Sequence, residues 1–381
     1  MREGWKTTTW GDLATLEYGK SLRDYQAETG EVPVYGTNGP IGFTDKSLCH
    51  FPSVIIGRKG AYRGVHYSDK PFFVIDTAFY LKPITDRLDL KFAYYQLLTQ
   101  DINSMDSGSA IPSTSREDFY NLQLKLPPLE TQRRIAAILS ALDEKIELNR
   151  QTNRTLETIA QVLFKEWFVD FNFPGATGEM QESELGPIPV GWRVGKLEEV
   201  CELNPRLSLK KGAVAKYIEM KNLSQSSLSI EEPREREFTS GSKFQNGDTL
   251  LARITPCLEN GKTGFVDFLY EQEVGWGSTE FIVLRGKETV GPYFIYCLSR
   301  LASFREFAIQ SMVGSSGRQR VVESILSDYQ LVIPNRETIN IFAKKAKELF
   351  NLVKINSEQA ATLSQIRDNL LPKLMSGEID V

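Results

Sequence analysis

Two long stretches of the chain carry hydrophobic residues at the spacing of an amphipathic helix. The first runs from about residue 129 to 168, and its seventh-residue positions are Ile135, Leu142, Asn149, Leu156 and Leu163. The second runs from about residue 336 to 375, and its matching positions are Phe342, Leu349, Asn356, Leu363 and Leu370. A hydrophobic repeat sustained over several heptads is typical of a coiled coil, and about 40 residues at about 1.5 Å each make a helix of roughly 60 Å. We therefore predict two long helices.

The two helical stretches belong to a longer internal repeat. Each follows a strand-like run that ends in proline, NLQLKLPP (121–128) and DYQLVIP (328–334). Pro127 and Pro334 are 207 residues apart, and this one offset aligns the two helices without a gap. Segments before the helices also correspond: SVIIGRKGAYRG (53–64) with DTLLARITPCLENGKTG (248–264), DTAFYLKP (76–83) with STEFIVLRG (278–286), and GSAIPSTSREDF (108–119) with GSSGRQRVVESIL (314–326). A duplication of one globular region and one helix explains this order.

The globular regions mix two periodicities. Runs such as FFVIDTAFYL and TEFIVLR predict strands, whereas KFAYYQLLTQDINSM and PYFIYCLSRLASFREFAI predict helices. The predicted fold class is α+β: two strand-rich α/β domains, related by a pseudo-twofold duplication and joined by two long antiparallel coiled-coil helices. The predicted boundaries are 1–128 for the first domain, 129–171 for the first helix, 172–190 for a linker, 191–334 for the second domain and 335–381 for the second helix.

The duplication suggests how the helices pair. In an antiparallel pair the middles of the helices meet, and Asn149 and Asn356 lie near the middles. A polar residue within a hydrophobic seam fixes the register of a coiled coil. We predict that the side chains of Asn149 and Asn356 lie close together and hydrogen-bond. In the alternative, both side chains face solvent at the edge of the seam.

Composition narrows the possible chemistry. The chain has 381 residues, 41% hydrophobic and 25% charged, as in ordinary folded proteins. A net charge of −4 argues against a uniformly basic protein that coats DNA, although local basic loops remain possible. The four cysteines form no Cys-x-x-Cys pair, so neither a zinc site nor a disulfide framework is expected, and free thiols suit a reducing cytoplasm. The sequence has no signal region and no apolar run of about 18 residues, so no membrane span is expected.

No catalytic centre is expected in the chain. ENGKTG ends like a phosphate-binding loop, but Pro256 stands where that motif needs its first glycine. Gly-x-Gly-x-x-Gly, Gly-x-Ser-x-Gly and the Asp/Asn-Pro-Pro-aromatic signature of adenine methyltransferases are all absent. No metal ligands and no cofactor site are predicted. A hydrolase that uses scattered carboxylates is one alternative, and clustered, strongly perturbed carboxylates in a cleft would favour it.

Cations, aromatics and glycines gather in loops that occur in both halves. Such loops allow arginine and tyrosine to approach a phosphate or a base edge, and arginine can bind guanine with two hydrogen bonds. The candidates in the first domain are Arg58, Lys59, Tyr62, Arg63, Ser109, Ser113, Thr114 and Arg116. Those in the second are Arg253, Thr255, Lys262, Ser315, Arg318, Gln319 and Arg320. The alternative for each is a role in stabilising a solvated turn.

The end of the first helix differs from the rest of it. FKEWFVDF (164–171) is aromatic nearly all round. If Phe164, Trp167 and Phe168 are exposed, they form a docking patch for another subunit. In the alternative they pack against the chain's own globular domain.

The whole arrangement resembles the specificity subunit of type I restriction–modification systems. LPPLETQRRIAAILSALDEKIELNRQTNRTLETIAQVLFKEWFVDF is similar to the central helical region of that family, ELGPIPVGWR (184–193) to the entry of its second recognition domain, and LLPKLMSGEI (370–379) to the close of its second helix. The resemblance covers essentially the whole chain.

The resemblance implies a non-catalytic, DNA-binding subunit. Its two target-recognition domains would each read one half of a split double-stranded DNA site, and the helices would set the gap between the halves. Two methyltransferase subunits would dock on it and supply S-adenosylmethionine. Restriction–translocase subunits, with ATP and Mg, would join for cleavage. Because no segment is strongly basic, the chain alone should bind DNA weakly. Two rival readings stay open: a specificity subunit of a type II (type IIB-like) enzyme, and a coiled-coil scaffold without DNA affinity.

Overall fold

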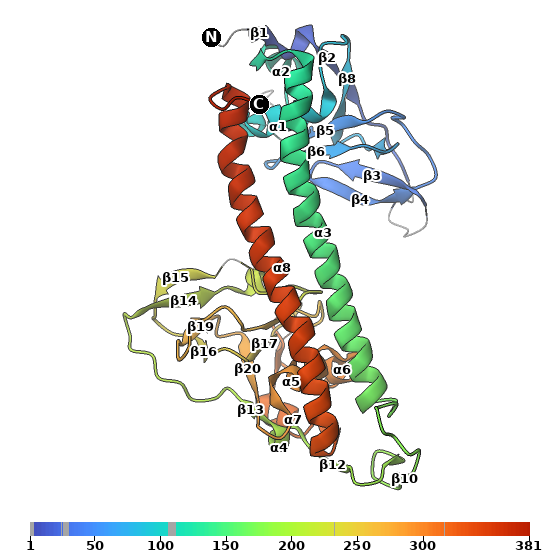
Figure 1. The fold of residues 1–381 in the computed structure, drawn as a ribbon, viewed down its shortest axis with the longest axis vertical. Helices are drawn as coiled ribbons and strands as arrows, with labels where there is room; N and C mark the ends of the chain where they lie inside the picture. The colour runs from blue at the N-terminus through green and yellow to red at the C-terminus, as the bar shows by residue number, and fades with distance from the viewer. Residues whose placement is uncertain (1–3, 24, 26–29, 106–111, 232, 316) are drawn as a thin grey trace. The chain divides into compact units, whose positions relative to one another are not determined.

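The computed structural model describes residues 4–23, 25, 30–105, 112–231, 233–315 and 317–381. The chain forms two compact units. Unit 1 comprises Met1–Ile146 and Ala361–Val381, and unit 2 comprises Glu147–Ala360. Two long helices, α3 (Leu129–Phe168) and α8 (Arg336–Ser376), each contribute a segment to both units (Figure 1). The division therefore falls inside the two long helices.

Unit 1 is built from short, mostly antiparallel strands and two short helices, besides its segments of α3 and α8. Its strands are β1 (Lys6–Thr9), β2 (Ala14–Tyr18), β3 (Val32–Gly36), β4 (Gly39–Thr44), β5 (Ser53–Gly57), β6 (Val65–Ser68), β7 (Phe73–Val74), β8 (Ala78–Pro83) and β9 (Gln123–Leu126), and its helices are α1 (Leu90–Leu98) and α2 (Arg116–Asn121). Its 3-10 turns are η1 (Trp10–Asp12) and η2 (Ile102–Ser104). The sheets have the strand orders β2-β8-β5-β6, β4-β3-β7 and β1-β9. All five residues of β5 are buried, as expected for a central strand covered on both faces.

Unit 2 repeats this plan. Its strands are β10 (Met180–Gln181), β11 (Ile188–Pro189), β12 (Arg193–Lys196), β13 (Cys201–Leu203), β14 (Val214–Ile218), β15 (Arg234–Glu237), β16 (Ser242–Phe244), β17 (Thr249–Ala252), β18 (Thr263–Phe265), β19 (Gly275–Gly277), β20 (Phe281–Gly286), β21 (Met312–Val313), β22 (Arg320–Val321) and β23 (Gln330–Ile333). Its helices are α4 (Leu197–Val200), α5 (Gly291–Arg300), α6 (Ala302–Gln310) and α7 (Glu323–Ser327), with a 3-10 turn η3 (Met220–Asn222). The order β13-β20-β17-β18 matches β2-β8-β5-β6, and the pair β12-β23 matches β1-β9.

The remaining sheets agree as well. In unit 1, β3 pairs with β4 antiparallel and with β7 parallel, and in unit 2, β14 pairs with β15 antiparallel and with β19 parallel. The two strand-rich α/β units therefore share one topology, which confirms the predicted α+β fold and its duplication. None of the helices in the described part of the chain is long and apolar enough to span a bilayer.

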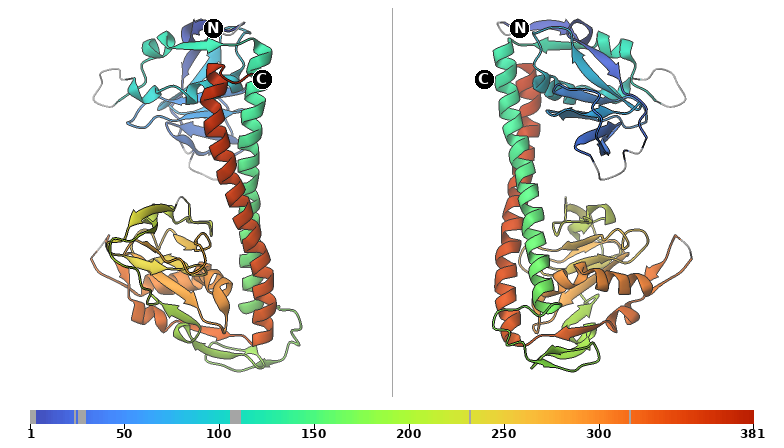
Figure 2. Two further views of the ribbon diagram at one scale, coloured as in Figure 1. Left: turned by 60° about the vertical axis from the view of Figure 1, so that its left-hand side comes forward. Right: turned by 90° about the vertical axis from the view of Figure 1, so that its right-hand side faces the viewer.

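The seam of unit 2, meaning the contact between its segments of α3 and α8, is antiparallel (Figure 2). Asn149 of α3 contacts Asn356 of α8. Asn153, which comes later in α3, contacts Val353, which comes earlier in α8, as expected for antiparallel helices. The Asn149 Nδ2 donates to the main-chain oxygen of Asn356 at 3.3 Å and to Gln359 Oε1 at 2.9 Å. The Asn356 Nδ2 instead donates to Asn153 Oδ1 at 2.9 Å. The two predicted asparagines therefore do meet, but the predicted bond between their side chains is wrong because Asn153 and Gln359 are the amide partners.

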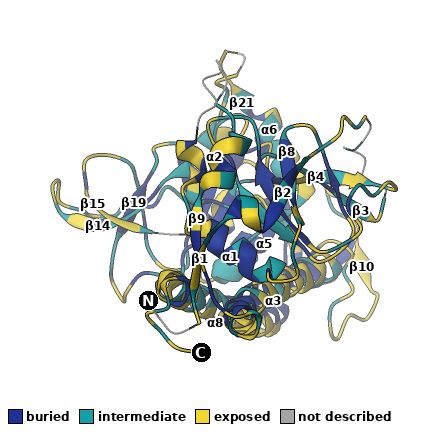
Figure 3. Ribbon diagram, turned by 90° about the horizontal axis from the view of Figure 1, so that it is seen from above, coloured by how far each residue is buried: buried dark blue, intermediate teal, exposed yellow. Residues whose placement is uncertain are grey.

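The seam of unit 1 has a different chemistry. Ile135 and Leu139 of α3 share a buried cluster with Leu374 and Met375 of α8. Nearby, Asp143 accepts hydrogen bonds from Tyr95 Oη at 2.6 Å and from Arg367 Nη1 at 2.7 Å. Burial and this bond raise the pKa of Tyr95 far above its usual value, so the phenol remains a donor. Seen from above in Figure 3, α3 and α8 each show buried and exposed residues, as amphipathic helices do.

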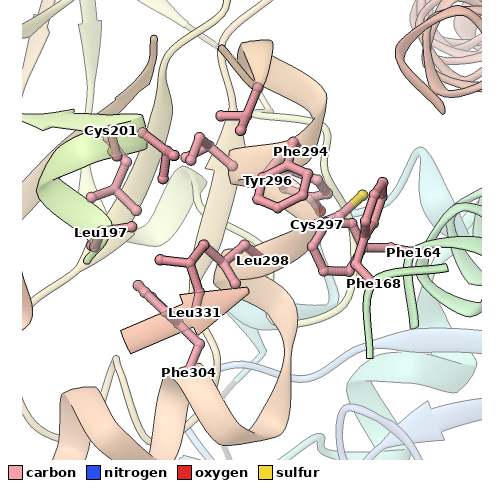
Figure 4. Close-up of a cluster of buried hydrophobic side chains, with 14 of the residues drawn as sticks. Phe164, Phe168, Leu197, Cys201, Phe294, Tyr296, Cys297, Leu298, Phe304 and Leu331 are labelled. Carbon is pink, nitrogen blue, oxygen red and sulfur yellow. The ribbon is translucent and has the colours of Figure 1, made fainter. Parts of the chain in front are cut away.

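The aromatic end of α3 is part of the core of unit 2. Phe164, Trp167 and Phe168 are only 1%, 4% and 6% exposed. The ring of Phe168 lies 5.0 Å from the rings of Phe294 and Phe342, measured between centroids, and Figure 4 shows Phe164 and Phe168 beside Phe294. The interpretation of these three residues as an exposed docking patch is therefore wrong, because the globular region packs over them.

Candidate nucleic-acid interface

Two loops of unit 1 pair with each other beyond the end of β5. The Thr114 amide donates to the Arg58 carbonyl at 2.9 Å, and the Gly60 amide donates to the Pro112 carbonyl at 2.9 Å. Lys59 and Ser113 form an antiparallel bridge between these two bonds. The Thr114 hydroxyl, which is buried, donates to the Gly57 carbonyl at 2.8 Å. Thr114 therefore holds the paired loops together, and its contact with DNA stays a prediction.

The paired loops of unit 1 present two arginines around one tyrosine. The guanidinium carbons of Arg58 and Arg116 lie 4.8 Å and 5.1 Å from the ring centroid of Tyr18, which is 48% exposed at the end of β2. Arg58 Nη1 donates to the Asp76 carbonyl at 3.1 Å. Arg116 donates to Tyr120 Oη from Nε at 3.2 Å and from Nη2 at 2.8 Å, and this bonding raises the pKa of Arg116. Stacking of this kind orients a guanidinium without removing its charge.

Other candidates of unit 1 have different environments. Tyr62 is 79% exposed, and Lys59 forms a partly exposed ion pair with Asp76 at 3.7 Å. Arg63 is only 3% exposed, and its Nη2 donates to the Asn103 carbonyl at 2.6 Å. The side chain of Arg63 is therefore enclosed, and its contact with DNA stays a prediction. Ser109 lies outside the described residues.

Unit 2 pairs the corresponding loops in the same way. The Val321 amide donates to the Arg253 carbonyl at 2.9 Å, and the Thr255 amide donates to the Gln319 carbonyl at 3.1 Å. Ile254 and Arg320 form the bridge between these bonds. The Thr255 hydroxyl accepts from the Gln319 amide at 3.2 Å, so it acts inside the turn. The repeated loops that the sequence aligned thus meet in both units.

The arginines of unit 2 are engaged by carboxylates. Arg253 Nη1 donates to Glu323 Oε1 at 2.8 Å, and its Nη2 donates to the Val321 carbonyl at 3.1 Å. Arg320 Nη2 donates to Glu280 Oε1 at 2.6 Å, and the bonds from Arg320 lower the pKa of Glu280. Arg253 is therefore a loop-stabilising residue in this structure, and its contact with DNA stays a prediction.

The remaining candidates of unit 2 divide between the interior and the surface. Lys262 Nζ donates to the Met220 carbonyl at 2.9 Å, and the contact of Lys262 with DNA stays a prediction. Ser315 and Arg318 are exposed on the loop that follows β21. Within the described residues, Arg318 has no ion-pair partner. Arg318 and Arg320 are thus the cations that unit 2 presents on this loop.

Three functional neighbours were missed in the sequence. Tyr18 stacks on both arginines of unit 1, Tyr120 binds Arg116, and Glu280 binds Arg320. Strand alternation alone could have placed Tyr18 on a surface, but its position beside Arg58 depends on the pairing of β2 with β8. Among the described residues, no three His, Cys, Asp or Glu side chains are grouped to hold a metal ion.

The helices carry exposed apolar residues at repeated positions. In unit 2, Leu148, Ile159 and Val162 of α3 are 53%, 46% and 54% exposed, and Leu352 and Ile355 of α8 are 48% and 58% exposed. Leu148 and Ile355 are equivalent under the 207-residue offset of the duplication. These five residues, which we call the apolar stripe of unit 2, face away from the seam and are free to contact another protein.

Comparisons with known proteins agree with this architecture. The family described as "Type I restriction modification DNA specificity domain" matches residues 2–158 and 189–365. The type I restriction enzyme MjaIX specificity subunit of Methanocaldococcus jannaschii is 27% identical over 309 residues, covering 76% of this chain and 69% of that protein. The HindI specificity subunit of Haemophilus influenzae is 23% identical over 382 residues, covering 82% of each. The S subunit of a type I system from M. genitalium has a similar fold, with a TM-score of 0.63 at 18% identity, covering 97% of this chain and 96% of that one.

Proposed function

Because the chain belongs to the type I restriction–modification DNA specificity family, we propose that it is the subunit that selects the DNA site of such a system. Each unit reads one half of a bipartite, asymmetric site through its paired loops, and α3 and α8 set the gap between the halves. The chain itself is not an enzyme in this proposal. Its free cysteines suit the reducing cytoplasm in which DNA is modified.

One observation carries the proposal: the same two loops pair in both units, and in each unit the paired loops present arginines. In unit 1 these are Arg58 and Arg116 on Tyr18, and in unit 2 they are Arg318 and Arg320. Arginines on rigid supports can bind phosphates and base edges with little loss of side-chain freedom. The side chains around them differ between the units, so the two half-sites should differ in sequence.

The proposal also includes the partner subunits of such a system and the surface on which they would dock. Methyl transfer and cleavage would be supplied by two methyltransferase subunits and by restriction–translocase subunits, which would bring S-adenosylmethionine, ATP and Mg. Since Phe164, Trp167 and Phe168 are buried, the methyltransferase would dock on exposed apolar residues of the helices instead. The equivalence of Leu148 and Ile355 offers a repeated contact, which suits two copies of one partner.

Methylation-site sequencing tests the assignment directly. The chain is co-expressed with its methyltransferase, and the methylated motif is compared among variants. Arg58→Ala with Arg116→Ala should alter one half-site, whereas Arg320→Ala should alter the other. Arg134→Ala on α3, an exposed arginine paired with Glu130, is the matched control and should leave the motif intact. If the variants of one unit altered both half-sites, the division of labour would be refuted.

The spacer and docking roles have separate tests. Lengthening α3 and α8 by one heptad each should change the gap and leave both half-sites unchanged. Ile355→Asp should weaken co-purification with the methyltransferase, because a charge on the apolar stripe of unit 2 opposes burial. Glu348→Asp, an exposed conservative change on the same helix, is the control. Equal co-purification of both variants would exclude this stripe as the docking surface.

A further inference from the structure

Glu280 accepts hydrogen bonds along one edge of the guanidinium group of Arg320. Arg320 Nε donates to both carboxylate oxygens of Glu280, at 3.1 Å and 2.9 Å, and Nη2 donates to Oε1 at 2.6 Å. The side chain of Arg320 is nevertheless 44% exposed, and that of Glu280 is 25% exposed. The pair therefore lies at the surface of the paired loops, with its geometry fixed by more than one bond.

The contact leaves the other edge of Arg320 free. A guanidinium has five N–H bonds, and the edge formed by Nε and Nη2 is the one that Glu280 occupies. Nη1 and the second N–H of Nη2 form a parallel fork on the end of the guanidinium, the edge next to the one that Glu280 occupies. Among the described residues, no partner of Nη1 is found. A fork of this shape matches the O6 and N7 acceptors that guanine shows in the major groove.

The backbone holds both members of the pair in place. Arg320 lies in β22, opposite Val313 of β21, and bridges to Ile254 across the paired loops. The Glu280 carbonyl accepts from the Arg253 amide at 2.9 Å, just before β20 begins. Both side chains therefore project from ordered, paired backbone, as residues that read a base edge need to do.

We infer that Glu280 is a positioning residue that aims the free fork of Arg320 at a guanine in the half-site read by unit 2. The inference rests on the proposed function, because it names one base contact of the DNA-reading surface. An ordinary surface ion pair would only stabilise the loop, and exposed pairs of that kind contribute little. If Glu280 positions Arg320, substituting Glu280 should change the methylated motif. If Glu280 only stabilises the loop, the motif should stay the same.

The matching place in unit 1 has no carboxylate. The Arg58 amide donates to the Thr77 carbonyl, as the Arg253 amide does to that of Glu280, so Thr77 and Glu280 are equivalent. Ser113 takes the place of Arg320 in unit 1, because it bridges to Lys59 as Arg320 bridges to Ile254. An arginine that a carboxylate aims at guanine is therefore expected in unit 2 alone. The half-site read by unit 1 serves as an internal control.

The test uses the complete complex with its methyltransferase and sequences the methylated sites. Arg320→Lys keeps the charge but removes the fork, and should reduce discrimination for guanine at one position by about 5- to 150-fold. Glu280→Gln should relax the same position by a smaller factor, and the double variant should be no worse than Arg320→Lys. Glu323→Gln, which alters the neighbouring pair with Arg253, should leave the motif unchanged.

Each outcome is decisive for this inference. A relaxed guanine at the same position in Arg320→Lys and Glu280→Gln supports it. An unchanged motif in Arg320→Lys, or relaxation at a different position in Glu280→Gln, overturns it. Glu280→Asp, which keeps the charge on a shorter stem, checks that any loss does not reflect misfolding, since it should retain guanine. If the unaltered complex methylated no bipartite site, the proposed function would fail and not this contact alone.

Discussion

The paired loops of the two units share a backbone but differ in charge. The Thr114 amide binds the Arg58 carbonyl as the Val321 amide binds that of Arg253, so Arg116, two residues on, is equivalent to Glu323. In unit 1 this place holds a second cation against Tyr18. In unit 2 it holds a carboxylate that binds Arg253. The same backbone thus carries two cations beside Tyr18 in unit 1 and an arginine–carboxylate pair in unit 2.

The seams of the two units differ as well. Unit 2 packs the rings of Phe164, Phe168 and Phe342 and adds a network of amide groups. Unit 1 packs aliphatic residues and adds the ion pair of Asp143 with Arg367. Rings from α3 and α8 pack on each other in the seam of unit 2, beside the amide network, so substitutions there should show how much each chemistry stabilises a helix pair.

The largest effect is expected from the aromatic cluster of unit 2. Phe342 is fully buried and contacts Phe164, Trp167 and Phe168. Phe342→Ala should lower the free energy of unfolding by about 3–5 kcal/mol, because it leaves a cavity among the rings. Denaturant titration of the full chain measures this. Ile341→Ala, one residue earlier and 37% exposed, should cost far less, and equal costs would show that the cluster is not a tightly packed core.

The next effect depends on pH and belongs to unit 2. Burial raises the pKa of Glu157 to about 7 from 4.5, although Ser227 Oγ and the Leu228 amide donate to its carboxylate. The folded state therefore keeps this proton at pH values where the unfolded state has lost it. The contribution of Glu157 to stability should be fully present below about pH 4.5 and be lost as the pH rises through about 7, by about 3 kcal/mol in total.

The Glu157 effect is isolated by comparing variants across pH. Denaturant titrations at intervals from pH 5 to pH 8 should show a downward slope in the unaltered chain. Glu157→Gln should reduce that slope, because its amide does not titrate, and should leave a smaller slope from Asp267, whose pKa burial raises to about 6. Glu147→Gln on the same helix, at an exposed position, should retain the slope. A slope of the same size in Glu157→Gln would assign the pH dependence to other groups.

A smaller effect is expected from the amide network of the unit 2 seam. Asn153 Nδ2 donates to the Val353 carbonyl at 3.1 Å and to Ser357 Oγ at 3.0 Å, and its oxygen accepts from Asn356. Asn153→Ala should lower the free energy of unfolding by about 1–3 kcal/mol, because it leaves buried polar groups without partners. Thermal unfolding measures the change. Gln151→Ala, at an exposed site of the same helix, should have an effect within about 0.5 kcal/mol, and a similar loss in both would deny the network a special role.

The helices and the duplication could be predicted from the sequence because their signals repeat. A heptad pattern shows directly which residues are buried, and one offset aligns both copies. The register of the seam needed more: a shift of about one helical turn decides whether Asn149 faces the side chain of Asn356 or that of Gln359. Two amphipathic helices are compatible with either arrangement, so only packing of the whole unit selects one.

The site was predictable in its location but not in its contacts. The repeated loops were found from the sequence. Arg58 and Arg63 are only five residues apart, yet Arg58 is partly exposed against Tyr18 and Arg63 is enclosed. Alignment of DTAF (76–79) with STEF (278–281) paired Thr77 with Thr279, whereas the strands make Thr77 equivalent to Glu280. A one-residue change of register moves a side chain to the other face of a strand, so Glu280 was missed.

The smallest effect returns to the charge difference between the paired loops. Arg58→Ala should weaken DNA binding of the complex modestly and reduce the salt dependence of log Kd by about one counterion, because an accessible cation is lost. Arg253→Ala, the equivalent change in unit 2, should leave that slope unchanged, since Glu323 and the Val321 carbonyl already hold the guanidinium. Titrations at several salt concentrations measure both slopes. Equal reductions would mean that Arg253 leaves Glu323 to bind phosphate. The paired loops of the two units would then differ in accessible charge only when no DNA is bound.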